Sequence, residues 1–312
     1  MLKIAFKWFK NLFPPFLGFF LIYYSYSNTT LDDRKTIYSS ILDANYFFVL
    51  LSICLGFFSH FIRAIRWKNM LSPMGYKIKF HNSLMCVFIA FLSNLGFPRS
   101  GEILRSSSIS YYEKIPIEKS FGTIITERII DVCILSLIIV YGSLISSNIN
   151  LSELSYSYLL IFILLFITIF LITKIKLNTK IIAIIKGLKK GITSISKIKN
   201  KPLFVLHTFL IWTCYFLMFY VVKFSINETV QLEYEALILA FIAGAITMSL
   251  TNGGIGAYPI AIAVVISQYD VSYENALALG WIVWSAQTLM IIFFGILSFI
   301  FLLASRSACS SF

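Results

Sequence analysis

The segment from Asn94 to Arg105 constrains the fold more than any other part of the chain. It interrupts a long apolar run with two glycines and a proline, and then places Arg99, Glu102 and Arg105 where a membrane helix would still lie in lipid. Charges at membrane depth persist only where they face protein or water, and broken backbone survives there only inside protein or along a cavity. A helix over 99–105 would present the three charged side chains on one face. We therefore predict a broken helix that can receive an anion.

Composition places this segment in an integral membrane protein. The chain is 58% hydrophobic and 13% charged, with a mean hydropathy of +0.84, whereas a soluble domain carries about 25% charged residues. We expect an all-α fold and one polytopic membrane domain over residues 1–312. The net charge of +12 comes from lysines beside apolar runs, which fits the positive-inside bias better than nucleic-acid binding. The five cysteines are scattered without metal-ligand spacing, so we expect no metal and no cofactor.

The apolar runs predict about six full transmembrane helices and two shorter interruptions. A full crossing needs about 20 residues. Full crossings are expected at 11–27, 46–62, 129–145, 158–173, 203–224 and 276–304, and three runs are too short, at 84–97, 237–250 and 257–268. The short runs are better explained by helical hairpins that enter and leave on the same side.

Loop charge sets the topology. Lysines precede the first span, and nine lysines lie between Lys174 and Lys201, whereas 225–236 carries three glutamates and no base. The positive-inside bias then puts both termini in the cytoplasm, and we expect a bacterial cytoplasmic membrane. For this pattern to hold, segments 84–126 and 236–274 must each cross an even number of times. We therefore predict two re-entrant hairpins of opposite orientation.

The second hairpin turns at Thr251 to Pro259 and echoes the first. Asn94 and Asn252 each begin a glycine-rich break that a proline follows, and they lie 158 positions apart in a chain of 312 residues. Paired broken helices of opposite orientation are typical of inverted-repeat transporters, so 1–156 and 157–312 are the expected repeats. Close helix packing is the alternative explanation of the glycines. We favour a site, because one packing glycine would suffice.

Two arginines end the second span on one helical face. Arg63 and Arg66 are three residues apart, and five of the seven arginines fall between residues 63 and 128. Anchoring at the cytoplasmic surface is the alternative. However, anchoring needs charge of either type, while arginine offers a planar fork that suits phosphate.

The span predicted at 129–145 begins with carboxylates. Glu127 and Asp131 lie four residues apart around Arg128, so they share a face at what we expect to be a positive helix N-terminus. A solvated first turn is the alternative. Asp131 lies well inside the apolar run, which favours a buried partner, Arg99 or Arg105. We predict that Glu102 or Asp131 pairs with Arg99, Arg105 or Arg128 inside the protein.

The middle loop predicts an amphipathic helix. Over residues 175–201, isoleucines gather on one face and lysines on the other, a pattern typical of helices that lie on an anionic inner leaflet.

Taken together, Arg63-x-x-Arg66-Trp67, Pro98-Arg99-x-Gly101-Glu102-x-x-Arg105, Glu127-Arg128-x-x-Asp131 and Gly253-Gly254-x-Gly256-x-x-Pro259 resemble the membrane region of bacterial lysylphosphatidylglycerol synthases. The resemblance covers roughly residues 10 to 304. It implies movement of a phospholipid or lipid-linked head group between leaflets. The synthases carry a cytosolic aminoacyl-transferase domain after this region and the present sequence does not, so we expect a stand-alone member that does not make lysylphosphatidylglycerol by itself.

Three function classes stay open. The first is a lipid flippase or scramblase with an arginine-lined anion site at the midplane. The second is an enzyme acting on a lipid phosphate or lipid-linked sugar, ranked lower because no nucleophile and base pair appears. The third is a non-transporting partner of an envelope-lipid enzyme; a homo-oligomer is also kept open. The residues expected at the lipid or anion site are Arg63, Arg66, Asn94, Arg99, Glu102, Arg105, Glu127, Arg128, Asp131, Asn252, Gly253, Gly254, Gly256 and Pro259.

Overall fold

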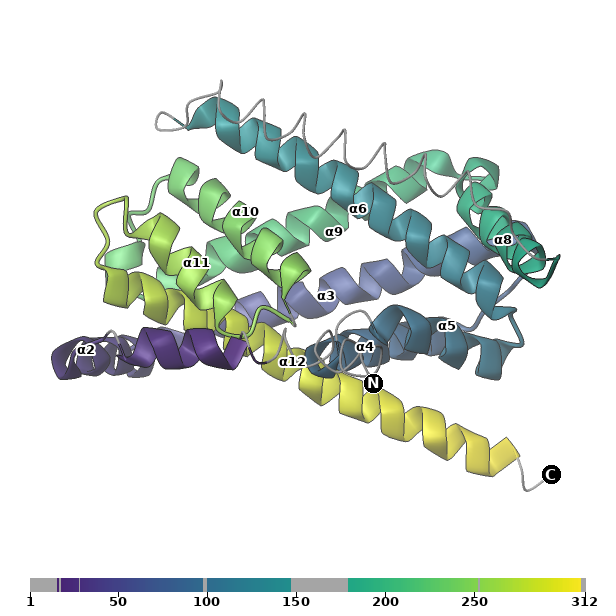
Figure 1. The fold of residues 1–312 in the computed structure, drawn as a ribbon, viewed down its shortest axis with the longest axis horizontal. Helices are drawn as coiled ribbons and strands as arrows, with labels where there is room; N and C mark the ends of the chain where they lie inside the picture. Colours follow the sequence, from purple (N-terminus) through teal and green to yellow (C-terminus); the bar gives the residue numbers. More distant parts are fainter. Residues whose placement is uncertain are drawn as a thin grey trace, which may run out of the picture.

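The computed structural model describes residues 16, 18–27, 29–97, 100–146, 179–251 and 253–309, and this part of the chain is helical without a strand. Its helices, drawn in Figure 1, are α2 (Leu31–Leu42), α3 (Tyr46–Leu71), α4 (Phe80–Gly96), α5 (Ser100–Glu113), α6 (Ile117–Ile145), α8 (Thr179–Ile192), α9 (Lys201–Val222), α10 (Tyr234–Leu250), α11 (Ala257–Ile266) and α12 (Tyr273–Cys309). A short 3-10 helix, η2 (Thr193–Lys197), joins α8 to α9.

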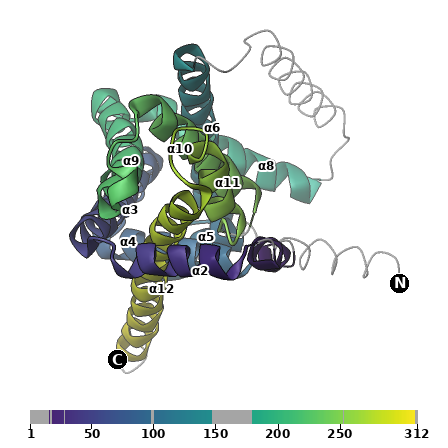
Figure 2. The same ribbon diagram turned by 90° about the vertical axis from the view of Figure 1, so that its left-hand side faces the viewer.

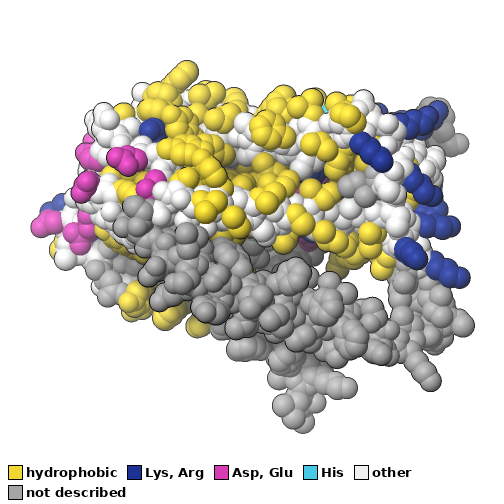
Figure 3. Space-filling model, turned by 90° about the horizontal axis from the view of Figure 1, so that it is seen from above, with side chains coloured by type: hydrophobic (Ala, Val, Ile, Leu, Met, Phe, Trp, Pro, Cys, Tyr) yellow, Lys and Arg dark blue, Asp and Glu magenta, His cyan; other side chains and the backbone are white. Residues whose placement is uncertain are grey.

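Four helices are long and apolar enough to cross a membrane: α3, α6, α9 and α12. Large apolar side chains such as Leu50, Leu137, Phe209 and Phe299 lie exposed along them. Figure 3 shows this apolar surface between an end rich in Asp and Glu and an end rich in Lys and Arg. Such a band is suited to lipid and not to water, and the protein is a multi-pass membrane protein.

The predicted helices at 46–62, 129–145, 203–224 and 276–304 are confirmed, and the short runs become α4, α10 and α11. The crossings predicted at 11–27 and 158–173 lie partly or wholly outside the described residues. Of the helix expected over 175–201, the described residues show α8 followed by η2, and its position on the inner leaflet stays a prediction. Helix α8 packs against α6, where a Cβ on Gly191 would lie 2.7 Å from Gly122 Cα. Viewed along the long axis of the molecule, α3 lies beside α9, and α8 lies beside α6 (Figure 2).

One predicted boundary is wrong. The carboxylates Glu127 and Asp131 were expected at the start of a helix, but α6 begins ten residues earlier, at Ile117, after Pro116 in the N-cap position. Several polar residues of this first part of the helix are buried, among them Ser120, Thr123 and Glu127 itself. The helix macrodipole acts only over the first turn, so it does not stabilise these carboxylates. Their compensation has to come from cations.

Two helical hairpins occupy opposite halves of the molecule. Helix α4 packs on α5, and α10 packs on α11. The α4–α5 hairpin lies toward the end that carries α8, and the α10–α11 hairpin toward the end that carries α2 (Figure 1). Their turns meet in between, since a Cβ on Gly253 would lie 2.6 Å from Leu95 Cδ2. This arrangement has the opposed orientation that an inverted repeat requires; re-entry into a membrane stays a prediction.

The contact between the two turns leads to a first testable prediction. Gly253 has a φ of +58°, a conformation that costs other residues about 1–2 kcal/mol. Gly253→Ala would add this strain to a close contact with Leu95, so we expect the free energy of unfolding to fall by about 1–3 kcal/mol. The measurement is SDS-induced unfolding of the purified protein.

Gly96→Ala is the matched control for that experiment. Gly96 is the last residue of α4, and apart from its chain neighbours and its own helix backbone, no atom of the described residues lies within 4 Å of a Cβ added there. Its free energy of unfolding should change little, or rise slightly because alanine favours a helix. Equal destabilisation by the two substitutions would contradict the contact between the turns.

Candidate functional site

Helix α3 brings two arginines into the interior. Arg63 is 1% exposed and Arg66 is not exposed at all, although anchoring at the membrane surface was the alternative for both. They lie one turn apart on the same face, and α3 continues beyond them to Leu71. A buried guanidinium is costly unless it is paired and hydrogen-bonded. Both therefore need partners from neighbouring helices.

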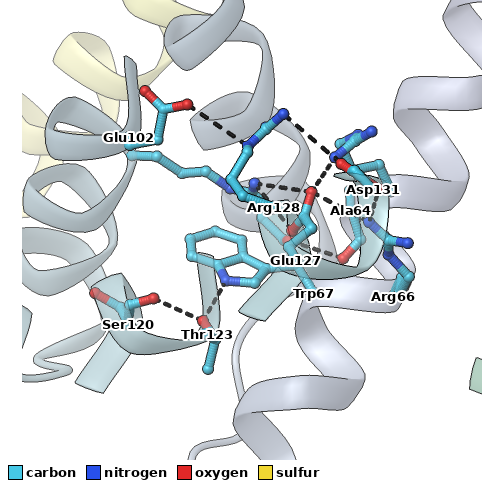
Figure 4. A network of polar contacts seen from close by, with 12 residues as sticks. Ala64, Arg66, Trp67, Glu102, Ser120, Thr123, Glu127, Arg128 and Asp131 are labelled. Carbon is cyan, nitrogen blue, oxygen red and sulfur yellow. Dashed lines mark hydrogen bonds and ion pairs between the residues drawn. The ribbon is translucent and has the colours of Figure 1, made fainter. Parts of the chain in front are cut away.

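Helix α6 supplies those partners. Glu127 and Asp131 lie one turn apart on α6 and face the two arginines of α3. Figure 4 shows Glu127 and Asp131 beside Arg66. Arg63 donates to Glu127 and, over 3.1 Å, to Asp131 Oδ2. Arg66 Nη2 lies 3.4 Å from Glu127 Oε1 and 3.5 Å from Asp131 Oδ1. The pairing ties α3 to α6 in the interior.

Helix α5 adds a third buried arginine from the first hairpin. Arg105 Nη1 lies 3.2 Å from Glu127 Oε2, and its guanidinium stacks 4.0 Å from the centroid of the Trp67 ring. The Trp67 indole is itself fixed, because its Nε1 donates to Thr123 Oγ1 over 2.9 Å. Glu127 thus contacts arginines from α3 and α5 and is the centre of the arrangement.

Arg128 and Glu102 form the outer part of this group of charged residues. Arg128 Nε lies 3.6 Å from Glu102 Oε1, and Arg128 Nη1 lies 3.7 Å from Asp131 Oδ2. The Arg128 side chain is 42% exposed and that of Glu102 19%, so this pair is the accessible edge of an otherwise buried group. The arginine cluster hereafter means Arg63, Arg66, Arg105 and Arg128 with Glu102, Glu127 and Asp131.

The arginine cluster has an excess of positive charge and of donors. Four guanidinium groups face three carboxylates, which leaves one net positive charge. Among the described residues, Arg105 Nε and Nη2 and Arg63 Nε have no hydrogen-bond partner although they are buried. Buried polar groups are normally satisfied. An anion with several acceptor oxygens would supply both the missing charge and the missing acceptors.

Of the arginines predicted to pair with Glu102 or Asp131, Arg128 contacts both carboxylates, whereas Arg105 is not a partner of Asp131 among the described residues. Within the described residues Asp131 pairs with Arg63, Arg66 and Arg128, and Arg105 turns instead to Glu127. Arg99 lies outside the described residues, as does Asn252.

Other predicted site residues have structural contacts. The Asn94 side chain accepts a hydrogen bond of 2.8 Å from the Gly101 N–H and so closes the first hairpin. A Cβ on Gly254 would meet Met248 and Tyr258, and one on Gly256 would meet Gly18 and Ile22. Pro259 packs against Gly280 of α12. In the described part of the chain, the contacts of the glycine turn are thus with packing residues and not with the arginines.

Sequence reasoning missed two hydroxyl groups on α9. Tyr215 accepts from Arg63 Nη2 over 2.9 Å, and Thr208 accepts from Arg66 Nη1 over 3.0 Å. The two residues are seven positions apart, so they lie on one helical face. The same helix also carries Thr213 and Tyr220, so the spacing of seven singles out Thr208 and Tyr215 only once the face of α9 that packs on α3 is known.

Comparison with known proteins adds to this geometry. Residues 14–295 match the family described as the lysylphosphatidylglycerol synthase TM region. UPF0104 membrane protein MJ1595 of Methanocaldococcus jannaschii is 28% identical over 151 residues, which cover 45% of this chain and 45% of that protein. UPF0104 membrane protein PH1989 of Pyrococcus horikoshii is 26% identical over 275 residues, which cover 75% of this chain and 80% of that protein. No solved structure matches.

The family match covers nearly the whole chain, including both hairpins and every residue of the arginine cluster. It therefore confirms the resemblance suggested by the four sequence motifs. This protein belongs to the lysylphosphatidylglycerol synthase transmembrane-region family.

Proposed function

We propose that this protein moves a phospholipid or a lipid-linked head group between membrane leaflets, as a flippase or scramblase. The observation that carries the proposal is the excess positive charge of the arginine cluster inside a protein with an apolar outer surface. A charge in the interior of a membrane protein is costly and generally marks a substrate or ion path. The substrate that combines an anionic group with apolar tails is a membrane lipid.

The chemistry of the arginine cluster suits a lipid phosphate. Guanidinium forks bind phosphate oxygens in pairs, and Arg105 has two donor atoms without partners among the described residues. Arg128 and Glu102 at the accessible edge form a long contact of 3.6 Å between partly exposed groups. Such a pair contributes little stability, so an incoming phosphate can separate it cheaply and reach the buried arginines behind.

We further propose that the Lys-rich end faces the cytoplasm. Figure 3 shows Lys and Arg at one end of the apolar band and Asp and Glu at the other, in line with the positive-inside bias. In this orientation the α4–α5 hairpin, which carries Arg105, enters from the cytoplasmic side. The α10–α11 hairpin enters from the opposite side.

Reconstitution tests the proposed function. The purified protein is reconstituted into vesicles that carry a fluorescent anionic phospholipid in both leaflets, and a membrane-impermeant quencher is added. With the protein, nearly all of the fluorescence should be lost, because lipid from the inner leaflet reaches the outer one. Vesicles without protein should lose only the half of the fluorescence that comes from the outer leaflet. Release of a head group without leaflet exchange would instead support an enzyme. Neither activity, with a folded and inserted protein, would contradict the proposal and favour a non-transporting partner.

A further inference from the structure

A groove of about 600 Å³ lies between α6 and α9, and Ser196 of η2 also lines it. Its wall is largely apolar and includes Ile130 and Ile134 from α6 and Phe204, Val205, Phe209 and Trp212 from α9. Val205 and Phe209 are exposed, so within the described part of the chain the groove lies on the outer, apolar surface of the protein. Its lining does not include any residue of the arginine cluster.

The length of the groove matches one leaflet. Along α9 it runs from Lys201 to Trp212, which at 1.5 Å per residue is about 16 Å. The hydrocarbon core of a bilayer is about 30 Å thick, so the groove covers roughly half of it. Its size and shape fit a single extended acyl chain, whereas a helix is about 10 Å wide with its side chains.

The position of the lysines indicates which leaflet a bound acyl chain would come from. Lys201 lies at one end of the lining, and Lys197 and Lys199 precede it at the Lys-rich end of the molecule. Lysines beside a membrane surface attract anionic head groups. The other end, at Trp212, lies three turns further into the apolar part of α9.

The back wall of the groove adjoins the arginine cluster. Thr208 lines the groove and accepts a hydrogen bond from Arg66 Nη1 over 3.0 Å. The ring of Phe204, another lining residue, lies 5.8 Å from the Arg66 guanidinium. One layer of side chains therefore separates the groove from the cluster, and a lipid held in the groove lies next to the proposed anion path.

We propose that this groove binds one acyl chain of an anionic phospholipid from the leaflet at the Lys-rich end, with the head-group phosphate at Lys201. The inference deepens the proposed function, because it names the position at which the lipid first binds. It rests on the proposed function only in assigning this binding a role in transport. Binding itself is independent of transport. An anionic lipid fits better than a neutral one because Lys201 is the charged group of the lining.

Photolabelling of the full chain in vesicles tests the proposal. The probes are phosphatidylglycerol and phosphatidylcholine that carry the same diazirine on the acyl chain. Label from phosphatidylglycerol should concentrate in 130–134 and 204–212. Lys201→Ala should lower it about fivefold, the contribution of one lysine at an anionic surface. Val205→Trp, which fills the groove, should abolish it.

Val264→Trp on α11 is the matched control, since Val264 is 49% exposed and Val205 63%; it should leave labelling unchanged. Label spread evenly over α3, α6, α9 and α12, or equal label from phosphatidylcholine, would overturn the inference even if the vesicles show leaflet exchange. Label confined to the groove in vesicles without exchange would support the groove and contradict the proposed function. The two failures are thus distinguishable.

Discussion

Glu127→Ala is expected to destabilise the folded protein by about 3–5 kcal/mol, the usual cost of removing one partner from a buried ion pair. Glu127 is fully buried and contacts Arg63, Arg66 and Arg105. Without it, four guanidinium groups would face only Asp131 and the partly exposed Glu102. The measurement is the SDS concentration at which half of the purified protein unfolds.

Two further variants separate charge compensation from simple loss of contacts. Arg63→Met combined with Glu127→Gln removes opposite charges together, so the double variant should be more stable than the sum of the single effects predicts. Additivity within about 0.5 kcal/mol would mean that the two charges are independently hydrated. Glu102→Ala is the control, because its contact with Arg128 is 3.6 Å long and partly exposed and should contribute less than about 1 kcal/mol.

The hairpins were predictable because their signal is local. Short apolar runs with glycine and proline between them cannot form straight membrane helices, and the paired breaks near Asn94 and Gly253 are visible in the sequence. Helix α8 was predictable for the same reason, since its apolar and basic faces repeat with the helical period. The contact of Gly253 with Leu95 joins residues far apart in the sequence, so no local pattern predicts it.

The start of α6 was not predictable from hydropathy. Residues such as Ser120 and Thr123 are polar and small, a composition typical of loops, yet they are buried in a helix against other helices. Gly122 lets α8 approach closely, and Thr123 accepts from Trp67. Hydropathy detects the part of a helix that faces lipid, and it misses a part that is covered by protein.

The pairing of charges within the arginine cluster could not be predicted from the sequence either. Local spacing places Arg63 with Arg66, and Glu127 with Asp131, each on one face. Which face meets which depends on how α3 packs against α6, and that contact joins residues more than 60 positions apart. The expected partner of Asp131 was therefore wrong for Arg105, while the expectation of a buried partner was right.

Arg105→Ala should slow lipid exchange strongly while the protein still folds. Removing this arginine takes the cluster from one net positive charge to neutrality, and Glu127 keeps Arg63 and Arg66 as partners. The free energy of unfolding should therefore fall less than in Glu127→Ala, with the loss limited to the contacts of Arg105 with Glu127 and Trp67, but the positive excess that attracts an anion disappears. A hydrogen-bonded charged contact contributes about 1.5–3 kcal/mol, so the exchange rate should fall by roughly 10- to 100-fold. The sequence motif Pro98-Arg99-x-Gly101-Glu102-x-x-Arg105 predicts the same role for Arg99, and Arg99→Ala is expected to act likewise.

Arg105→Lys separates charge from geometry. Lysine keeps the positive charge but loses both the fork and the flat face that lies 4.0 Å from the Trp67 ring, so exchange should recover only in part. Arg34→Ala removes one arginine near the end that carries α2 and should leave exchange unchanged. Wild-type exchange in both Arg99→Ala and Arg105→Ala would exclude the first hairpin as the anion site. The remaining buried arginines, Arg63 and Arg66, would then be the groups that receive the phosphate, because they alone combine full burial with positive charge among the described residues outside that hairpin.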